Sequence, residues 1–318
     1  MTSLSFDVLT MGRVGVDLYP EQTGVALPDV RSFAKSLGGT ATNVAVAAAR
    51  LGAGAAVITK VGDDPFGTYV RRALEGFGVD ARYVSTHPSL RTPIVFCEIF
   101  PPDDFPLLFY REPKAPDMEL TADDLDLDAI RAARIFYVTG TGLADEPSRS
   151  TTLAALAARG NAGVTVIDLD YRPVLWASRE DARLAMQEAL PHVTVAIGNQ
   201  DECETAVGVR EPRAAAAALR ERGVDLAIVK QGPKGVLAVD RDGSVEVPPV
   251  PVEVVNGLGA GDAFGGALCH GLLRGWDAER TMRFGNAAGA LVASRLQCAD
   301  AMPTEDEVEA MLGEAVDA

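Results

Sequence analysis

The sequence predicts an α/β fold in which a mostly parallel sheet is covered by helices. Two observations lead to this prediction. Short β-branched segments alternate with Ala- and Leu-rich helical segments from end to end of the chain, which is the order expected of a parallel sheet with helical crossovers. Several strand segments are apolar throughout, without alternation of apolar and polar residues, as expected when both faces of a strand are buried.

The predicted elements follow one another in regular order. The strand segments are β-branched, and the helical segments are rich in strong helix formers. Strands are expected at residues 6–11, 56–61, 135–138, 164–168, 193–197 and 226–230. Helices are expected at residues 43–51, 66–77, 148–159, 179–190, 213–222 and 261–273.

Two segments interrupt this order. Residues 13–36 contain no clear helix, and residues 92–114 contain two short strands, 94–99 and 107–110, around a Pro-Pro-Asp-Asp turn. A hairpin inserted between α/β units indicates an extra β-layer, which is either a lid over a site or a surface hairpin without a role in function. Because no linker is visible, we expect residues 1–318 to form one domain with these two segments inserted as a lid.

Charge and composition exclude several classes of partner. The chain has 45 acidic and 29 basic side chains, a net charge of -16, whereas nucleic acid or an anionic membrane requires a basic face. No segment reaches the roughly 18 apolar residues of a membrane span, and the N-terminal residues lack a signal-peptide pattern. The 4 cysteines and 3 histidines stand singly, so we expect a cytoplasmic protein without disulfides or a zinc site.

The segment from Asn256 to Phe264 is the strongest chemical signal. Its three glycines bring backbone N–H groups close to an anion, and the helix that follows adds unpaired donors. Asp262 lies in the first helical turn, where a carboxylate beside the anion can accept a proton from an attacking hydroxyl during phosphoryl transfer. Capping of the helix is the alternative role for Asp262. No Gly-Lys-Ser/Thr follows, so the segment is not a P-loop.

A second glycine pair, Gly38 and Gly39, also precedes a helix. Asn43 either caps this helix or offers its amide to a ligand hydroxyl. Asp17, which follows the first strand, either accepts hydrogen bonds from sugar hydroxyls or is solvated. Local chemistry leaves both pairs of alternatives open.

These two segments resemble the two signatures of the ribokinase-like (PfkB) family of carbohydrate kinases. The first signature matches at Gly38, Gly39, Asn43, Ala45, Gly52 and Gly62, the second at residues 256–264, and intervening landmarks match at 168–173, 176, 199–202 and 230–235. The resemblance covers essentially the whole chain. It implies a three-layer α/β/α sandwich with a small β-sheet lid, and ATP-dependent phosphorylation of a small sugar.

The resemblance also implies a role for each matching residue. Asp262 is the expected general base, and the expected anion hole is formed by Gly259, Ala260 and Gly261. The sugar hydroxyls are expected to bind Asp17, Gly39 and Asn43. The nucleotide site is expected to contain Asn199, Lys230, Gly232, Gly235 and Asn286. Glu202 is expected to bind Mg²⁺ through water, since Mg²⁺ gives up its hydration shell reluctantly.

Arg172 is expected either to contact a phosphate or a charged substrate group, or to form a structural ion pair with Asp168 or Asp170. Two positions depart from the family pattern. Asn256-Gly257 replaces the usual Asp-Thr, and Asp170 stands where Asn is common. The first departure puts in question any cation or phosphate contact that the usual side chains make. A monovalent cation such as K⁺ is a further candidate cofactor.

Other features are similar to those of the family members that phosphorylate 5-dehydro-2-deoxygluconate, an acidic keto sugar of inositol breakdown. These features are residues 11–20, 97–106, 110–111, 114–117, 256–257 and 265–271. Arg13, Arg111 and Lys114 lie on the expected lid segments. They either pair with the carboxylate of such a substrate or only solvate a face.

Several alternatives remain open. Another sugar kinase of the same family would act on 2-keto-3-deoxygluconate, fructose or ribose. A non-catalytic sugar- or nucleotide-binding regulator is a different class, and a nicotinamide-dependent oxidoreductase is disfavoured because no GxGxxG follows the first strand. We also expect a homodimer formed through the lid strands, because an exposed β-layer leaves edges and an apolar face to cover.

Overall fold

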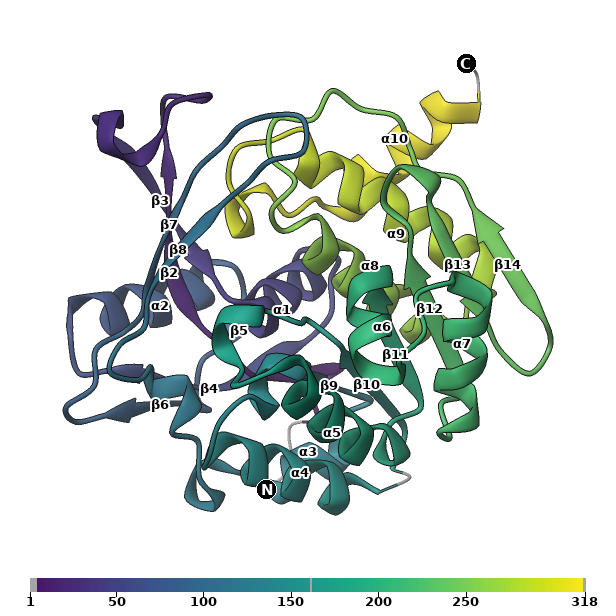
Figure 1. Cartoon of the computed structure of the whole chain (residues 1–318), viewed down its shortest axis with the longest axis horizontal. Helices are drawn as coiled ribbons and strands as arrows, with labels where there is room; N and C mark the ends of the chain where they lie inside the picture. The colour runs from purple at the N-terminus through teal and green to yellow at the C-terminus, as the bar shows by residue number, and fades with distance from the viewer. Residues whose placement is uncertain (1–4, 161, 317–318) are drawn as a thin grey trace.

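The computed structural model describes residues 5–160 and 162–316, and a 10-stranded sheet forms its centre (Figure 1). The strands of this sheet are β1 (Val8–Met11), β4 (Ala55–Gly62), β5 (Val79–Asp80), β6 (Val84–His87), β9 (Ile135–Thr139), β10 (Val164–Asp168), β11 (Val195–Asn199), β12 (Leu226–Lys230), β13 (Val236–Val239) and β14 (Ser244–Val247). Their order is β14-β13-β12-β11-β10-β9-β1-β4-β5, and β6 pairs with β4. All pairings are parallel except those of β13 with β12 and with β14.

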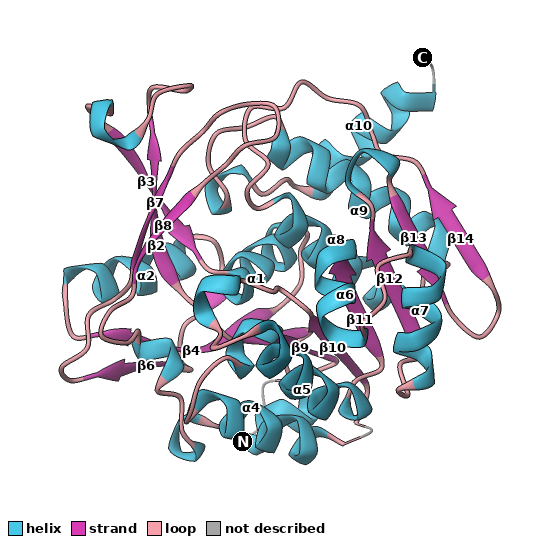
Figure 2. Ribbon diagram, viewed as in Figure 1, coloured by secondary structure: helices cyan, strands magenta, loops and turns pink. Residues whose placement is uncertain are grey.

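Successive residues of the central strands point into two different apolar cores. In β1, Val8 packs into the first core and Leu9 into the second, and Ile135 and Phe136 of β9 divide in the same way. The first core is closed by α1 (Thr40–Arg50), α2 (Pro65–Gly76), α8 (Ala260–Arg274), α9 (Ala278–Ala293) and α10 (Glu305–Val316). The second is closed by α3 (Leu127–Ala132), α4 (Ser148–Arg159), α5 (Arg179–Ala189), α6 (Gln200–Val207) and α7 (Pro212–Glu221). The predicted layers of helix, sheet and helix are thus confirmed (Figure 2).

A separate small sheet stands at one end of the central sheet, at the upper left of Figure 1. Its strands are β2 (Gly15–Pro20), β3 (Phe33–Gly38), β7 (Ile94–Cys97) and β8 (Leu107–Tyr110), in the order β3-β2-β7-β8. The predicted hairpin is confirmed as the antiparallel pair β7–β8. Its first strand ends at Cys97, two positions before the predicted end. Strand β2 and the first part of β3 lie within residues 13–36, where the sequence indicated only that no helix forms.

Two helices begin at glycines with a left-handed or unusual backbone. Gly39 is the N-cap of α1 with φ +98°, and Gly259 is the N-cap of α8 with φ +83°. A Cβ atom at residue 39 would lie 2.4 Å from the carbonyl oxygen of Arg13, so no other residue fits there without a shift. Asn43 and Asp262 therefore lie inside their helices. The capping alternatives for these two side chains are wrong.

Some elements were not predicted at all. Strands β13 and β14 form a short hairpin at one edge of the central sheet, and α3 and α10 also lie outside the predicted segments. The cysteines are free and buried in the part of the chain that the structure describes. Among the described helices, none combines the length and the apolar character needed to cross a bilayer.

Candidate active site

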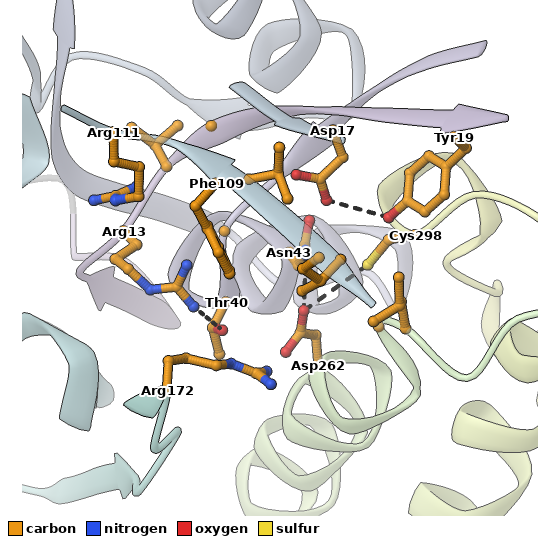
Figure 3. A pocket seen from close by; sticks show the side chains of 17 residues that line it. Arg13, Asp17, Tyr19, Thr40, Asn43, Phe109, Arg111, Arg172, Asp262 and Cys298 are labelled. Carbon is orange, nitrogen blue, oxygen red and sulfur yellow. Dashed lines mark hydrogen bonds between the residues drawn. The ribbon is translucent and has the colours of Figure 1, made fainter. Parts of the chain in front are cut away.

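A pocket lies at the carboxyl ends of β1 and β10, where ligands bind in open α/β sheets, and the small sheet forms one of its walls (Figure 3). The atom-free space here is about 530 Å³, part of which is open to solvent. The predicted residues that line it are Asp17, Gly39, Asn43, Arg111, Arg172, Gly259 and Asp262. The predicted residues outside this lining are Ala260, Gly261, Asn199, Glu202, Lys230, Gly232, Gly235 and Asn286.

Asp262 lies in the first turn of α8 and faces Asn43 of α1. The Asn43 side-chain amide donates to Asp262 Oδ2 at 2.7 Å. Burial raises the pKa of Asp262 to about 7, against the lowering effect of the Asn43 hydrogen bond. A carboxylate whose pKa lies near neutral pH is well matched to general-base chemistry. Asn43 Oδ1 is buried and has no partner among the described residues, so it is available to accept a hydrogen bond from a ligand.

Asp17 of β2 lies on the opposite wall of the pocket, next to Tyr19 (Figure 3). The Tyr19 hydroxyl donates to Asp17 Oδ2 at 3.1 Å, and burial raises the pKa of Asp17 to about 6. The carboxylate packs against Gly38, where a Cβ atom would lie 2.0 Å from Asp17 Oδ1. The first glycine of the Gly38-Gly39 pair therefore makes room for the acid.

Three arginine side chains gather in the pocket. Arg13 Nη2 and Arg172 Nε each donate to Asp170 at 3.0 Å, and Arg111 pairs with Asp117. The structural ion pair considered for Arg172 therefore forms with Asp170. Its side chain is nevertheless 41% exposed, against 7% for Arg13 and 8% for Arg111. Arg172 is the most accessible of the three guanidinium groups, and the carboxyl groups of Asp17 and Asp262 line the same pocket.

Asp170 suits this arrangement in both backbone and charge. Its φ is +31°, in a region that Asn and Asp tolerate better than other non-glycine residues. Burial raises the pKa of this carboxyl, but Arg13 and Arg172 outweigh the burial and lower the pKa to about 2. An acid at the place where the family commonly has Asn thus gives two arginines a shared partner.

Lys114, considered with Arg13 and Arg111 as a partner for a substrate carboxylate, does not line the pocket. Its ammonium group pairs with Glu119 at 2.8 Å and with Asp145 at 3.1 Å. These two carboxylates therefore neutralise the charge of Lys114 outside the pocket.

Lys230 ends β12 and lies beside the predicted anion hole. A Cβ atom at Gly261 would be 3.2 Å from Lys230 Nζ. No hydrogen bond or ion pair joins this ammonium group to any residue that the structure describes. Burial lowers the pKa of Lys230, but the nearby carboxylates of Asp168, Glu202 and Asp262 raise it above its ordinary value. Lys230 is therefore a charged group free to meet an anion.

Asn199 and Glu202 form a capping box at the start of α6. Asn199 Oδ1 accepts from the Glu202 N–H at 2.9 Å, and Glu202 Oε2 accepts from the Asn199 N–H at 2.6 Å. This pattern is readable in the sequence as an Asn followed three residues later by Glu. Glu202 Oε1 accepts no hydrogen bond within the described chain, and burial raises the pKa of this carboxyl. One oxygen of Glu202 thus remains available for a Mg²⁺-bound water.

Two of the last three predicted residues, Gly235 and Asn286, contact the end of β14 and the chain that follows it. A Cβ atom at Gly235 would lie 2.0 Å from the Val247 carbonyl oxygen. The Asn286 amide donates to the carbonyl oxygens of Val247 at 3.3 Å and Pro248 at 2.7 Å. Gly232 has φ +58° in the turn between β12 and β13. Gly235 and Asn286 thus contact the same backbone segment, and the amide of Asn286 is hydrogen-bonded to it.

Several pocket residues were not identified from the sequence. They are Val14, Gly15, Tyr19, Thr40, Val95, Leu107, Phe109, Leu258 and Cys298. Tyr19 was detectable, since alternate residues of a strand share a face with Asp17. Cys298 lies 3.8 Å from Asp262 Oδ2, and a Cβ atom at Gly259 would lie 2.1 Å from its sulfur. No local pattern joins Cys298 to Asp262.

A parallel sheet, a glycine-led helix and a buried acid at its start are the features expected of a phosphotransferase. The model of the pfkB family of carbohydrate kinases matches residues 5–305. The protein therefore belongs to the PfkB family of carbohydrate kinases.

The chain is also similar to individual members of this family over most of its length. The chain is 32% identical over 314 residues to 5-dehydro-2-deoxygluconokinase of Shouchella clausii, covering 97% of this chain and 96% of that protein. It is 33% identical over 310 residues to the enzyme of the same name from Geobacillus kaustophilus, covering 95% and 92%.

Solved structures establish the ribokinase-like fold. An E. coli protein described as a candidate ribokinase II, solved with ATP and Mg²⁺, superposes with a TM-score of 0.89 at 26% identity and covers 98% of this chain and 100% of its own. A double mutant of a Vibrio cholerae fructokinase, solved with fructose, ADP and a potassium ion, superposes with a TM-score of 0.85 at 25% identity and covers 97% and 99%.

Proposed function

We propose that this kinase transfers the γ-phosphoryl group of ATP to a hydroxyl of 5-dehydro-2-deoxygluconate, with Asp262 as the general base. The observation that supports this most strongly is the buried carboxylate of Asp262, with its pKa raised to about 7, at the start of a helix and facing a pocket that three arginine side chains line. A substrate carboxylate can pair with the exposed guanidinium of Arg172, which favours a sugar acid over a neutral sugar. The names of the curated relatives support the same substrate.

In this mechanism the acceptor hydroxyl lies against Asp262, which takes its proton as the oxygen attacks. The N–H groups of Gly259, Ala260 and Gly261 at the start of α8 hold the phosphoryl oxygens, and Lys230 adds positive charge beside them. Asp17 and the unpartnered oxygen of Asn43 accept hydrogen bonds from the sugar. Because Gly39 has no side chain, the sugar can approach Asp17 and Asn43 closely.

ATP and Mg²⁺ are the proposed co-substrate and cofactor, in keeping with the contents of the E. coli neighbour. Bound Mg²⁺ would neutralise phosphate charge, and Glu202 would hold it through water with its free oxygen. The nucleotide would lie along Asn199, Lys230, Gly232 and Gly235. Asn286 would position the segment after β14 on that side.

We also propose that the small sheet is a lid inserted into a single domain, since it carries Asp17 and Arg111 on the pocket side. A cytoplasmic location is proposed because the described cysteines are free thiols, as expected in a reducing compartment.

The function is tested by ADP release from Mg-ATP with 5-dehydro-2-deoxygluconate, 2-keto-3-deoxygluconate, fructose and ribose. We expect strong preference for the first, because the exposed guanidinium of Arg172, which pairs with Asp170 through Nε, can also pair with the carboxylate of this substrate. Arg172→Ala should raise KM for the acid about 10-fold or more, as expected when a charged hydrogen-bond partner is lost, and should change KM for ATP little. Lys114→Ala, a matched cation outside the pocket, should leave both KM values unchanged.

Other outcomes would redirect this assignment. Preference for a neutral sugar, or equal KM values in Arg172→Ala and the parent, would exclude the sugar-acid role of the arginine pocket. Binding of sugar and ATP without any turnover would favour a non-catalytic regulator.

A homodimer through the small sheet is proposed as well. Leu108 and Tyr110 of β8 are 48% and 61% exposed. Their face also carries a row of aromatic rings, with Phe96 lying 5.4 Å from both Phe33 and Tyr110. An exposed apolar sheet face of this kind is a typical protein interface. Sedimentation should show a dimer that Leu108→Lys converts to a monomer, and a parent protein that sediments as a monomer would refute the proposal.

A further inference from the structure

Asn256 joins two segments that are far apart in the sequence. Its side chain is fully buried. The amide nitrogen donates to the carbonyl oxygen of Leu296 at 2.7 Å, and Oδ1 accepts from the N–H of Leu258 at 3.0 Å. Both polar groups of the Asn256 side chain are therefore hydrogen-bonded, one to Leu296 and the other to Leu258. We call the contact between these two segments the junction.

The two joined segments both reach the active site. On one side, Leu258 and Gly259 line the pocket and lead into the anion hole. On the other side, residues 294–300 carry Cys298, which contacts Asp262, and Asp300, which accepts a hydrogen bond from Ser36 of β3 at 2.5 Å. The Asn256 amide thus connects the loop from Asn256 to Gly259, here called the anion-hole loop, to residues 294–300, which also contact the small sheet through Asp300.

The chemistry of this junction depends on a donor at residue 256. An aspartate, which the family signature usually has here, offers only acceptor oxygens when ionised. Facing the Leu296 carbonyl, it would place two acceptors together in a buried site, and a cation or a proton would have to lie between them. An asparagine closes the same gap with its own N–H.

We infer that Asn256 is a positioning residue that closes this junction as a neutral amide, so that the anion-hole loop of this kinase is held without a monovalent cation. The residues at this position therefore do not fit the K⁺ considered as a cofactor. The inference concerns the same site as the proposed function, and its activity readout rests on that function. A second readout, thermal stability without substrates, does not.

The experiment compares the parent protein, Asn256→Asp and Asn256→Ala in KCl and in choline chloride at equal ionic strength. The parent should have the same melting midpoint and the same turnover in both salts. Asn256→Asp should melt lower and turn over more slowly in choline, and KCl should restore both in part. Asn256→Ala removes the donor without adding charge, so its turnover should fall about 10- to 100-fold, as expected for a misplaced site, and KCl should not restore it.

Each readout can overturn the inference. A parent protein that melts higher or works faster in KCl than in choline would show that its junction uses a cation. An Asn256→Asp protein that matches the parent in choline would show that the amide donor is not needed. If no sugar is phosphorylated, the melting midpoints still decide the inference, and only the proposed function fails. If Asn256→Asp does not fold, the parent protein in the two salts still tests it.

Discussion

Asp262→Asn is expected to lower kcat by about 10²- to 10⁴-fold, the usual contribution of a general base, while KM for sugar and ATP changes only a few-fold. The amide keeps the size of the side chain and its contact with Asn43 but cannot accept the proton. ADP release gives kcat, and calorimetric titration gives the two affinities. Retained turnover, or loss of binding together with turnover, would rule out this role for Asp262.

A pH profile gives the same prediction a second signature. Because burial raises the pKa of Asp262 to about 7, the base is protonated below that pH. The parent kcat/KM should therefore rise with pH up to about 7 and fall about tenfold per unit at lower pH. The residual activity of Asp262→Asn should lack this pH dependence.

The effect of pH on the stability of the folded protein has the opposite sign. A carboxyl whose pKa is raised on folding stabilises the protein at acid pH and loses this effect as pH rises towards 7, so Asp262→Asn should gain stability relative to the parent on going from pH 5 to pH 8.

Lys230→Met is expected to lower kcat about 10²- to 10³-fold, as does removal of one preorganised group that stabilises transition-state charge, and to raise KM for ATP. Lys230 Nζ lies beside Gly261 in the predicted anion hole. Burial raises the pKa of Asp168 and of Glu202, and the charge of Lys230 opposes this rise. Methionine keeps the length of the side chain without its charge.

Lys114→Met is the matched control, because it removes a lysine paired with Glu119 and Asp145 outside the pocket. Steady-state kinetics of the two variants with ATP varied give the comparison. Parent-like kcat in Lys230→Met, or an equal loss in both variants, would remove Lys230 from the phosphoryl site.

The fold was predictable where the signal is local. Apolar β-branched runs such as 226–230 and alanine-rich segments such as 213–222 are recognisable within a few residues. Most of the central sheet and its helices were therefore predicted. The edge strands β13 and β14 were not, because they are only four residues long each and β14 is half exposed. Helix starts at Gly39 and Gly259 were misplaced or ambiguous because backbone angles, not side chains, set them.

The candidate site was predictable only through its glycine signatures. They identified Asp262 and Asn43, whose hydrogen bond spans 219 positions of the chain. Contacts without such a marker were missed, including that of Cys298 with Asp262 and that of Arg13 with Asp170, whereas the pair of Arg172 with Asp170 was one of the alternatives considered. Tertiary packing alone creates these contacts, so a single sequence does not indicate them.

The small sheet divides its residues between two tasks by simple alternation. On β8 and just beyond it, Leu107, Phe109 and Arg111 face the pocket, whereas Leu108 and Tyr110 face outward. A one-residue insertion or deletion within such a strand exchanges the two faces. It would turn Leu108 and Tyr110 towards the pocket and Leu107, Phe109 and Arg111 outward in a single step. Variation in substrate range can therefore arise here by substitution at alternate positions, while the length of each strand is constrained by both surfaces at once.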